Sequence, residues 1–116
     1  MDNQVIIKLQ RGKKDGLSCL PVKIKGQPVL FMIDTGAYHS FVGLELLRRL
    51  GLAAAVAPNH PVMATMGRRH QDRIEGGATL KLEVVKGFIA KHDFCVSAVG
   101  TNILGTDFLR NYDGKV

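Results

Sequence analysis

Alternation of apolar and polar residues predicts that most of this 116-residue chain forms β-strands. The segments 17–25 and 79–84 show the period-two pattern most clearly, with aliphatic residues set against lysine, threonine or glutamate. Two further apolar segments, 5–9 and 88–99, are also predicted to be strands. The pattern therefore indicates a small all-β fold.

An unbroken apolar run over residues 29–33 predicts a buried strand. The turn-forming residues 26–28 precede it, so this strand and the one before it are expected to form a hairpin. Asp34, Thr35 and Gly36 follow as a tight turn. The sequence thus places the carboxylate of Asp34 at the end of a buried strand, where burial and neighbouring groups set its acidity.

Helical spacing is clearest over residues 40–52, where leucines recur on one face. Ser40 is predicted to cap the start of this helix, and Gly51 is placed for a left-handed stop at its end. A second, short helix is predicted over 107–112, with Asp107 as its cap.

The region between these helices predicts a long hairpin over about residues 62–76. Residues 62–66 are predicted to be extended, and 67–70 form a polar tip. Gly76 and Gly77 are expected to break or kink the returning strand.

Length and composition indicate one domain, residues 1–116, in which segment 1–16 is predicted to be peripheral. No apolar run approaches the roughly 20 residues of a membrane helix, and the N-terminus lacks the pattern of a signal peptide. No membrane partner and no secretion are therefore expected. Cys19 and Cys95 lie among apolar residues and are predicted to be free thiols.

The net charge of +6 comes from short basic groups rather than from a continuous stripe. Aromatic residues make up only 6%, so nucleic acid is not expected as the main partner. A basic nucleic-acid-binding β domain remains a rival interpretation. The four histidines and two cysteines show no zinc-site spacing, so neither a metal nor another cofactor is expected.

The chemistry of Asp34 depends on a second carboxylate. Two carboxylates held about 3 Å apart cannot both ionise, so they share a proton and can activate a water molecule. The chain contains one Asp-Thr-Gly sequence, so the second copy would come from another subunit. A symmetric homodimer with both Asp34 side chains near its two-fold axis would supply it.

The segment 29–43, with its Asp-Thr-Gly-Ala core, resembles the active-site segment of retroviral-type aspartic proteases (retropepsins). Its continuation Ala-x-His-Ser-Phe-Val is closest to proteases of gypsy-type LTR retrotransposons. Residues 103–109, Ile-Leu-Gly-Thr-Asp-Phe-Leu, resemble the family's hydrophobic-hydrophobic-Gly motif and C-terminal helix. The resemblance covers roughly residues 18–113. It implies a closed β-barrel-type monomer with one or two short helices that is active as a homodimer.

The resemblance also implies roles for individual residues. Asp34 would be the catalytic aspartate, Thr35 would lock the two active-site loops together across the dimer, and Gly36 would bond to the substrate backbone. A flap around residues 65–71 would close over an extended peptide. The residues expected to contact substrate are Ala37, Thr65, Met66, Gly67 and Ile103.

Two positions depart from the retroviral pattern. Retroviral members usually carry Asp where this chain has Tyr38 and Arg where it has Thr106, and those two residues form a contact near the dimer interface. Their joint replacement predicts that the dimer is weaker or uses other surfaces.

The sequence therefore predicts an aspartic endopeptidase that processes a polyprotein in the cytoplasm or within a virus-like particle. Peptide or polyprotein would be its substrate and a second copy its partner. The alternative is a catalytically weak, domesticated retropepsin-like module that serves for dimerisation or peptide binding.

Overall fold

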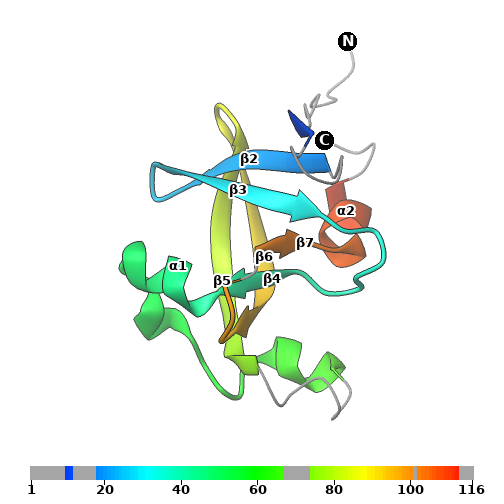
Figure 1. Cartoon of the computed structure of the whole chain (residues 1–116). Helices are drawn as coiled ribbons and strands as arrows, with labels where there is room; N and C mark the ends of the chain where they lie inside the picture. The colour runs from blue at the N-terminus through cyan, green and yellow to red at the C-terminus, as the bar shows by residue number, and fades with distance from the viewer. Residues whose placement is uncertain (1–9, 12–17, 67–73, 101, 113–116) are drawn as a thin grey trace.

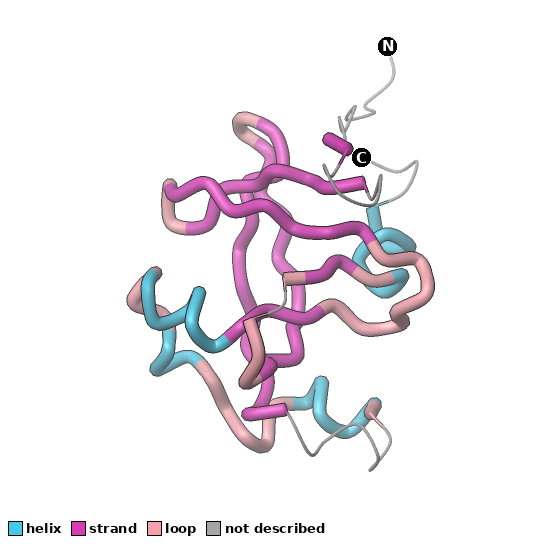
Figure 2. The backbone as a smooth tube through the Cα atoms, viewed as in Figure 1, coloured by secondary structure: helices cyan, strands magenta, loops and turns pink. Residues whose placement is uncertain are grey.

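The computed structural model describes residues 10–11, 18–66, 74–100 and 102–112, and in this part the chain is mainly β-sheet (Figure 1). The strands of the described part are β1 (Gln10–Arg11), β2 (Ser18–Ile24), β3 (Gln27–Ile33), β4 (Phe41–Gly43), β5 (Ile74–Val85), β6 (Phe88–Ser97) and β7 (Ile103–Leu104). The helices are α1 (Leu44–Arg49), α2 (Thr106–Tyr112) and two 3₁₀ helices, η1 (Ala53–Ala55) and η2 (Pro61–Thr65). Figure 2 shows that the helices lie around the strands rather than between them.

Six of the described strands close into a barrel. They are hydrogen-bonded in the order β2-β3-β7-β4-β6-β5, and β5 pairs back to β2 through Lys23 and Glu83. β1 pairs antiparallel with the first two residues of β2. The prediction of an all-β, closed-barrel monomer with one or two short helices is confirmed.

The β2–β3 hairpin turns at Lys25 and Gly26, which both have positive φ, as a two-residue turn of matching twist requires. β3 begins at Gln27, one residue into the turn that the sequence predicts over 26–28. β3 is also not buried on both faces. Phe31 is fully buried, but Leu30 is 51% exposed, because a barrel strand turns alternate side chains to solvent.

The barrel interior is a continuous apolar core with Phe31, Phe94 and Phe108 among its largest fully buried side chains. The rings of Phe31 and Phe94 lie 5.6 Å apart between centroids. A smaller cluster of Val62, Met66 and Cys95 packs beneath η2. Within the described residues, none of the helices is long and apolar enough to cross a membrane.

The predicted helix over 40–52 is shorter than expected. Phe41, Val42 and Gly43 instead form β4, because they pair with β6 on one side and with β7 on the other. Ser40 is buried and does not cap α1, whose N-cap is Gly43 without a side-chain bond.

The predicted stop of this helix is present. Gly51 has a φ of +73°, and its N–H donates to Arg48 while the N–H of Leu52 donates to Leu47. These two bonds are those of a Schellman motif, in which a left-handed residue ends the helix.

The prediction that residues 62–66 are extended is wrong. They belong largely to η2, which begins at Pro61. Of the break or kink predicted at Gly76 and Gly77, the break is absent because β5 runs through both, but the strand is irregular there, with a register shift between Ile74 and Gly76. Gly77 exchanges two 2.9 Å backbone hydrogen bonds with Ala57, and a Cβ there would overlap nearby side chains. Because the glycines have no side chain, the segment before η2 can pack directly against the sheet. The predicted hairpin tip at 67–70 and most of segment 1–16 lie outside the described residues.

Candidate functional site

The chain leaves β3 at Asp34, passes around the end of β7 and returns as β4, forming a loop over residues 34–40 (Figure 1). β7 lies between the two strands, parallel to β3 and antiparallel to β4. The N–H of Asp34 donates to the carbonyl of Leu104 on β7 at 3.1 Å. The position of Asp34 is therefore set by backbone pairing on both sides of the loop.

The Asp34 carboxylate is oriented by its own turn. The N–H of Gly36 donates to Asp34 Oδ1 at 2.9 Å, and the N–H of Ala37 donates to the Asp34 carbonyl at 3.1 Å. Asp34 is half-buried, whereas Thr35 and Gly36 are exposed. One carboxylate oxygen is thus fixed by a backbone donor, and the tip of the turn is open to an approaching molecule.

The first turn of α2 holds the other end of this loop. The N–H groups of Thr106 and Asp107 donate to the carbonyls of Ala37 and Tyr38 at 2.8 and 3.0 Å. Gly105 lies so close that a Cβ would overlap the carbonyl oxygens of Ala37 and His39. The hydrophobic-hydrophobic-Gly motif therefore supports the Asp34 loop. Its glycine is needed because a residue with a Cβ would prevent the loop backbone from approaching so closely.

A buried polar network lies beneath the loop. Ser40, which is fully buried, donates through Oγ to Asp107 Oδ1 at 2.6 Å and through its N–H to Oδ2 at 3.3 Å. The N–H of Gly105 donates to Ser40 Oγ at 3.0 Å. His92 Nε2 lies 3.1 Å from Asp107 Oδ2, within ion-pair distance but without an aligned hydrogen bond.

Serine, histidine and aspartate meet here, but not as a nucleophilic triad. Asp107 stands between Ser40 and His92, whereas a triad needs the histidine next to the serine as its base. The serine is also inaccessible to substrate. The network is structural.

The charges of this network shift two pKa values. Burial would raise the pKa of Asp107, but the adjacent His92 ring, the Ser40 hydroxyl and the N–H of Phe108 together lower it below its ordinary value. Burial and the nearby charge of Asp107 raise the pKa of the Cys95 thiol to about 11. These shifts favour the ionised form of the Asp107 carboxyl and the neutral form of the Cys95 thiol.

A hollow of about 630 Å³ lies beside the loop, bounded by η2, β6 and α2. His39 Nε2 reaches across it to Thr65 Oγ1 at 2.8 Å. Because the Thr65 hydroxyl donates to the Val62 carbonyl at 2.7 Å, His39 is the donor in this bond. The active-site loop and η2 are thus joined by a side-chain hydrogen bond.

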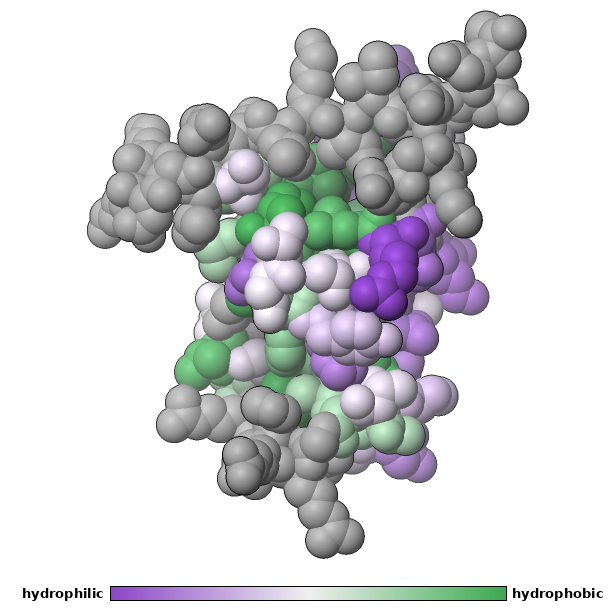
Figure 3. All heavy atoms as spheres, turned by 90° about the vertical axis from the view of Figure 1, so that its right-hand side faces the viewer, coloured by the Kyte–Doolittle hydropathy of each residue, from purple (hydrophilic) through white to green (hydrophobic). Residues whose placement is uncertain are grey.

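Both positions that depart from the retroviral pattern lie at this end of the molecule. Tyr38 is 57% exposed, and the guanidinium of Arg110 lies 5.8 Å from its ring centroid. Thr106 contributes its backbone N–H to the loop. Figure 3 shows that this face mixes apolar and polar side chains, with strongly hydrophilic groups gathered at one side.

The predicted site residues fall into three places. Asp34 to Ala37 form the loop itself, and Ile103 lies on β7 beside them, paired with Met32 and Phe41. Thr65 is exposed on η2, whereas the Met66 side chain is buried with its Sδ 3.3 Å from Cys95 Sγ. Gly67 lies outside the described residues.

Sequence reasoning did not find the Ser40–Asp107–His92 network or the bond between His39 and Thr65. Ser40 and Asp107 each have a local interpretation as helix caps, which hides their contact. The available signal was the alternation of β6, which places His92 on the same buried face as Ala90 and Phe94.

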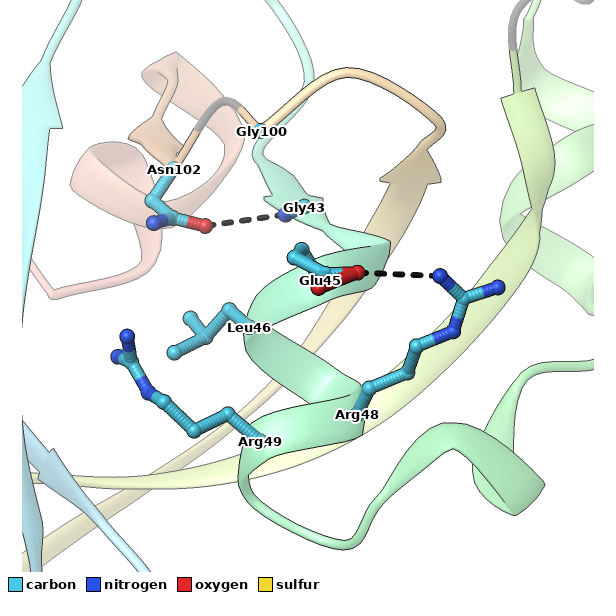
Figure 4. A pocket seen from close by; sticks show the side chains of 7 residues that line it. All are labelled: Gly43, Glu45, Leu46, Arg48, Arg49, Gly100 and Asn102. Carbon is cyan, nitrogen blue, oxygen red and sulfur yellow. Dashed lines mark hydrogen bonds and ion pairs between the residues drawn. The ribbon is translucent and has the colours of Figure 1, made fainter.

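A separate hollow of about 580 Å³ lies at the start of α1 (Figure 4). Asn102 Oδ1 accepts the N–H of Gly43 at its rim, and Arg48 pairs with Glu45 at 3.0 Å. No residue of the Asp34 turn lines it, so it is distinct from the candidate site. Among the described residues, no group of three or more His, Cys, Asp or Glu side chains could hold a metal ion.

Solved structures with this fold include three proteases or protease-like domains. The retroviral protease-like domain of Ddi1 from Leishmania major matches with a TM-score of 0.66 and 22% identity, covering 82% of this chain and 76% of that one. A retropepsin-like aspartic protease from Rickettsia conorii matches with a TM-score of 0.64 and 19% identity, covering 92% and 79%. EIAV protease, solved with the inhibitor HBY-793, matches with a TM-score of 0.62 and 20% identity, covering 92% and 98%.

These likenesses establish the retropepsin-like fold. No curated protein sequence matches this chain. The family model described as "gag-polyprotein putative aspartyl protease" matches residues 20–111, which include both the Asp34 turn and the 103–105 motif. The chain therefore belongs to the gag-polyprotein aspartyl protease family.

Proposed function

We propose that this protein is an aspartic endopeptidase that cleaves extended peptides. The observation that carries the proposal is the geometry of the Asp34 turn. A half-buried carboxylate is oriented by the N–H of Gly36, and the loop around it is held by Leu104 on one side and Thr106 on the other. Such preorganisation is what a carboxylate needs to act on water without rearranging during the reaction.

The active unit in this proposal is a homodimer. Each chain supplies one Asp34, and the two carboxylates share a proton, so that one activates water while the other hydrogen-bonds to the scissile carbonyl. The exposure of Thr35 and Gly36 supports this arrangement, because a partner loop can reach the turn without displacing core residues. Cleavage is expected to favour acidic to mildly acidic pH, since the pair must keep one proton.

The proposed substrate is a polyprotein, and the proposed setting is the cytoplasm or a virus-like particle. Membership of a gag-polyprotein family supports the substrate. The free thiols of Cys19 and Cys95 agree with a reducing compartment. Ala37 and Ile103, on the loop and on β7, are the proposed wall of the peptide-binding cleft.

The direct test is digestion of a peptide library, read by mass spectrometry with and without pepstatin. Wild-type protein should cut a restricted set of peptides, and Asp34→Asn should cut none while keeping its fold. Asp93→Asn is the matched control, because it changes a carboxylate that contacts Thr79 rather than the loop. Cleavage by the Asp34→Asn protein would refute the mechanism.

Mixing wild-type and Asp34→Asn protein distinguishes a dyad shared between two chains from a site contained in one chain. If one catalytic unit needs two intact chains, adding an equal amount of Asp34→Asn protein to a fixed amount of wild type should reduce its activity to about half, because mixed dimers are inactive. A site contained in one chain would lose nothing. Peptide binding without cleavage would instead favour the alternative of a peptide-binding or dimerisation module.

A further inference from the structure

We propose that Asp107 and His92 are positioning residues, which form a charged brace beneath the Asp34 loop and keep it in its catalytic geometry. The inference rests on the proposed function, because the Asp34 loop matters for activity only if Asp34 acts on substrate. It concerns two side chains that do not reach the exposed turn themselves. Their action runs through Ser40 and the loop backbone.

The contacts of Asp107 require its ionised form. Its Oδ1 accepts the Ser40 hydroxyl at 2.6 Å and the N–H of Phe108 at 2.7 Å, while Oδ2 accepts the N–H of Ser40. Every one of these partners is a donor. A proton on Oδ2 would face the Ser40 N–H and break that contact, because a carboxylic acid loses acceptor capacity where it gains its own O–H.

Through these bonds the carboxylate controls the far end of the loop. Ser40 closes the loop that Asp34 begins, and its Oγ also accepts the N–H of Gly105. The neighbouring N–H groups of Thr106 and Asp107 hold Ala37 and Tyr38. Loss of the Asp107 charge would therefore loosen the part of the loop that is tied to α2, and the Asp34 carboxylate would lose its fixed orientation.

His92 is placed to balance this charge. Its side chain is only 7% exposed, and its ring packs edge-on against Phe94 and Phe108 at centroid distances of 5.3 and 5.2 Å. Nε2 lies 3.1 Å from Asp107 Oδ2. A protonated imidazole at this distance forms an ion pair with the carboxylate.

Other titratable groups face the same region from each neighbouring element. Tyr38 and His39 lie on the loop and His60 lies before η2, where it faces Asp93. Lys91, Asp93 and Cys95 belong to the strand of His92. Among these groups, Asp107 is the carboxylate in direct contact with the His92 ring.

The pairing has a functional consequence. An aspartic dyad works under acidic conditions, where an ordinary aspartate begins to take up protons. The charge of a protonated His92 opposes protonation of Asp107, so the pair favours the ionised carboxylate on which the brace depends. The structure thus pairs an acid-requiring site with a support that tolerates acid.

The test is the pH dependence of peptide cleavage by His92→Gln. A neutral side chain removes the positive charge, so Asp107 should take up its proton at higher pH. The acid limb of the kcat profile should move upward by about one pH unit, the smallest shift expected for loss of an adjacent opposite charge, while KM changes little. Ser40→Ala should lower kcat at every pH, because the loop loses its side-chain bond to Asp107. His60→Gln, which changes a histidine that contacts Thr79 rather than Asp107, should keep the wild-type limb.

A second measurement does not depend on activity. In Asp34→Asn protein, NMR titration should show the backbone amides of Ser40 and Thr106 shifting with the same midpoint as the Asp107 carboxyl carbon, and His92→Gln should raise that midpoint. Amides that stay constant while Asp107 titrates would overturn the brace, with no need for a further variant. An unchanged midpoint and an unchanged acid limb in His92→Gln would overturn it as well. Coupled titration in a protein that cuts no peptide would leave the brace standing and reject the protease.

Discussion

The backbone N–H of Asp34 donates to the carbonyl of Leu104 at 3.1 Å, which ties the Asp-Thr-Gly turn to the hydrophobic-hydrophobic-Gly motif. β7 continues this contact, because Met32 and Ile33 pair in parallel with Ile103 and Leu104. The two motifs therefore build one structural unit, although they lie far apart in the sequence. A change in the second motif should act on the first.

Gly105→Ala tests this dependence. The added methyl group would overlap the carbonyl oxygens of Ala37 and His39, and backbone atoms cannot move aside as a flexible side chain can. We expect a loss of about 3 kcal/mol in the free energy of unfolding, the upper end for overpacking, together with loss of cleavage. Urea denaturation measures the first and the peptide assay the second.

Gly100→Ala is the matched control, since a Cβ at that position meets no heavy atom within 4 Å and the backbone does not require a glycine conformation. It should change stability by less than about 0.5 kcal/mol, as is usual at exposed sites. Equal effects of the two substitutions would show that the contact with the loop is not what makes Gly105 necessary.

The parts of this molecule that could be predicted are those that local pattern determines. Three features depend on neighbouring residues alone: the carboxylate after an apolar strand, the glycine at residue 51 that ends a helix, and the alternation along β5. The paired motifs then identify the fold, because each occurs in the order and spacing of the retropepsins. The roles predicted for Asp34 and Ile103 follow from these two motifs.

The parts that could not be predicted depend on partners distant in sequence. β4 has three residues and exists because β6 and β7 pair with it, so its sequence reads more naturally as the start of a helix. Ser40 and Asp107 both suit helix starts, and only the folded chain brings them within 2.6 Å. His92 looks like any residue on the inner face of a strand until Asp107 is placed beside it.

The Asp107 network should make stability depend on acid pH. The folded-state pKa of Asp107 is lowered, so the unfolded chain binds the proton more readily. The stabilisation is therefore present above the ordinary pKa of aspartate, about 3.9, and is lost as pH falls through the folded-state value. We expect wild-type stability in urea to decline below about pH 4.

Asp107→Asn should remove this contribution. At pH 7 it should cost about 2 kcal/mol, because an amide NH₂ would face the Ser40 N–H and leave a buried donor unsatisfied. The gap between wild type and variant should narrow as pH falls below about 4, where the wild-type carboxylate is lost too. Asp93→Asn, at a largely exposed side chain, is the control. A constant gap between pH 7 and the acid range would contradict the assignment.

The two cysteines should differ sharply in reactivity. Cys95 is fully buried, and its pKa is raised to about 11, so roughly one molecule in a thousand carries the thiolate at pH 8. Cys19 is partly exposed on β2. Iodoacetamide at pH 8 should modify Cys19 in the native protein and both cysteines in urea, as read by intact mass. Cys19→Ser protein should resist modification until it unfolds, and rapid native labelling of that variant would disprove the burial of Cys95.

His60 should exist as a single tautomer. Its Nδ1 accepts the N–H of Val62 at 3.0 Å, so the proton of the neutral ring lies on Nε2, which donates to Thr79 Oγ1 at 2.9 Å. The Thr79 hydroxyl in turn donates to Asp93 Oδ1 at 2.6 Å. Nitrogen-15 NMR at neutral pH should therefore show the Nε2–H form.

The same ring caps η2, so His60→Phe should cost about 1 kcal/mol by removing the acceptor for Val62. Thr79→Val keeps the cap but removes the acceptor of the Nε2 proton and the donor to the exposed Asp93, so it should cost less and leave the tautomer unchanged. Urea denaturation of both variants gives the comparison. A ring that carries its proton on Nδ1, or a Thr79→Val protein less stable than His60→Phe, would show that the cap is not what fixes this histidine.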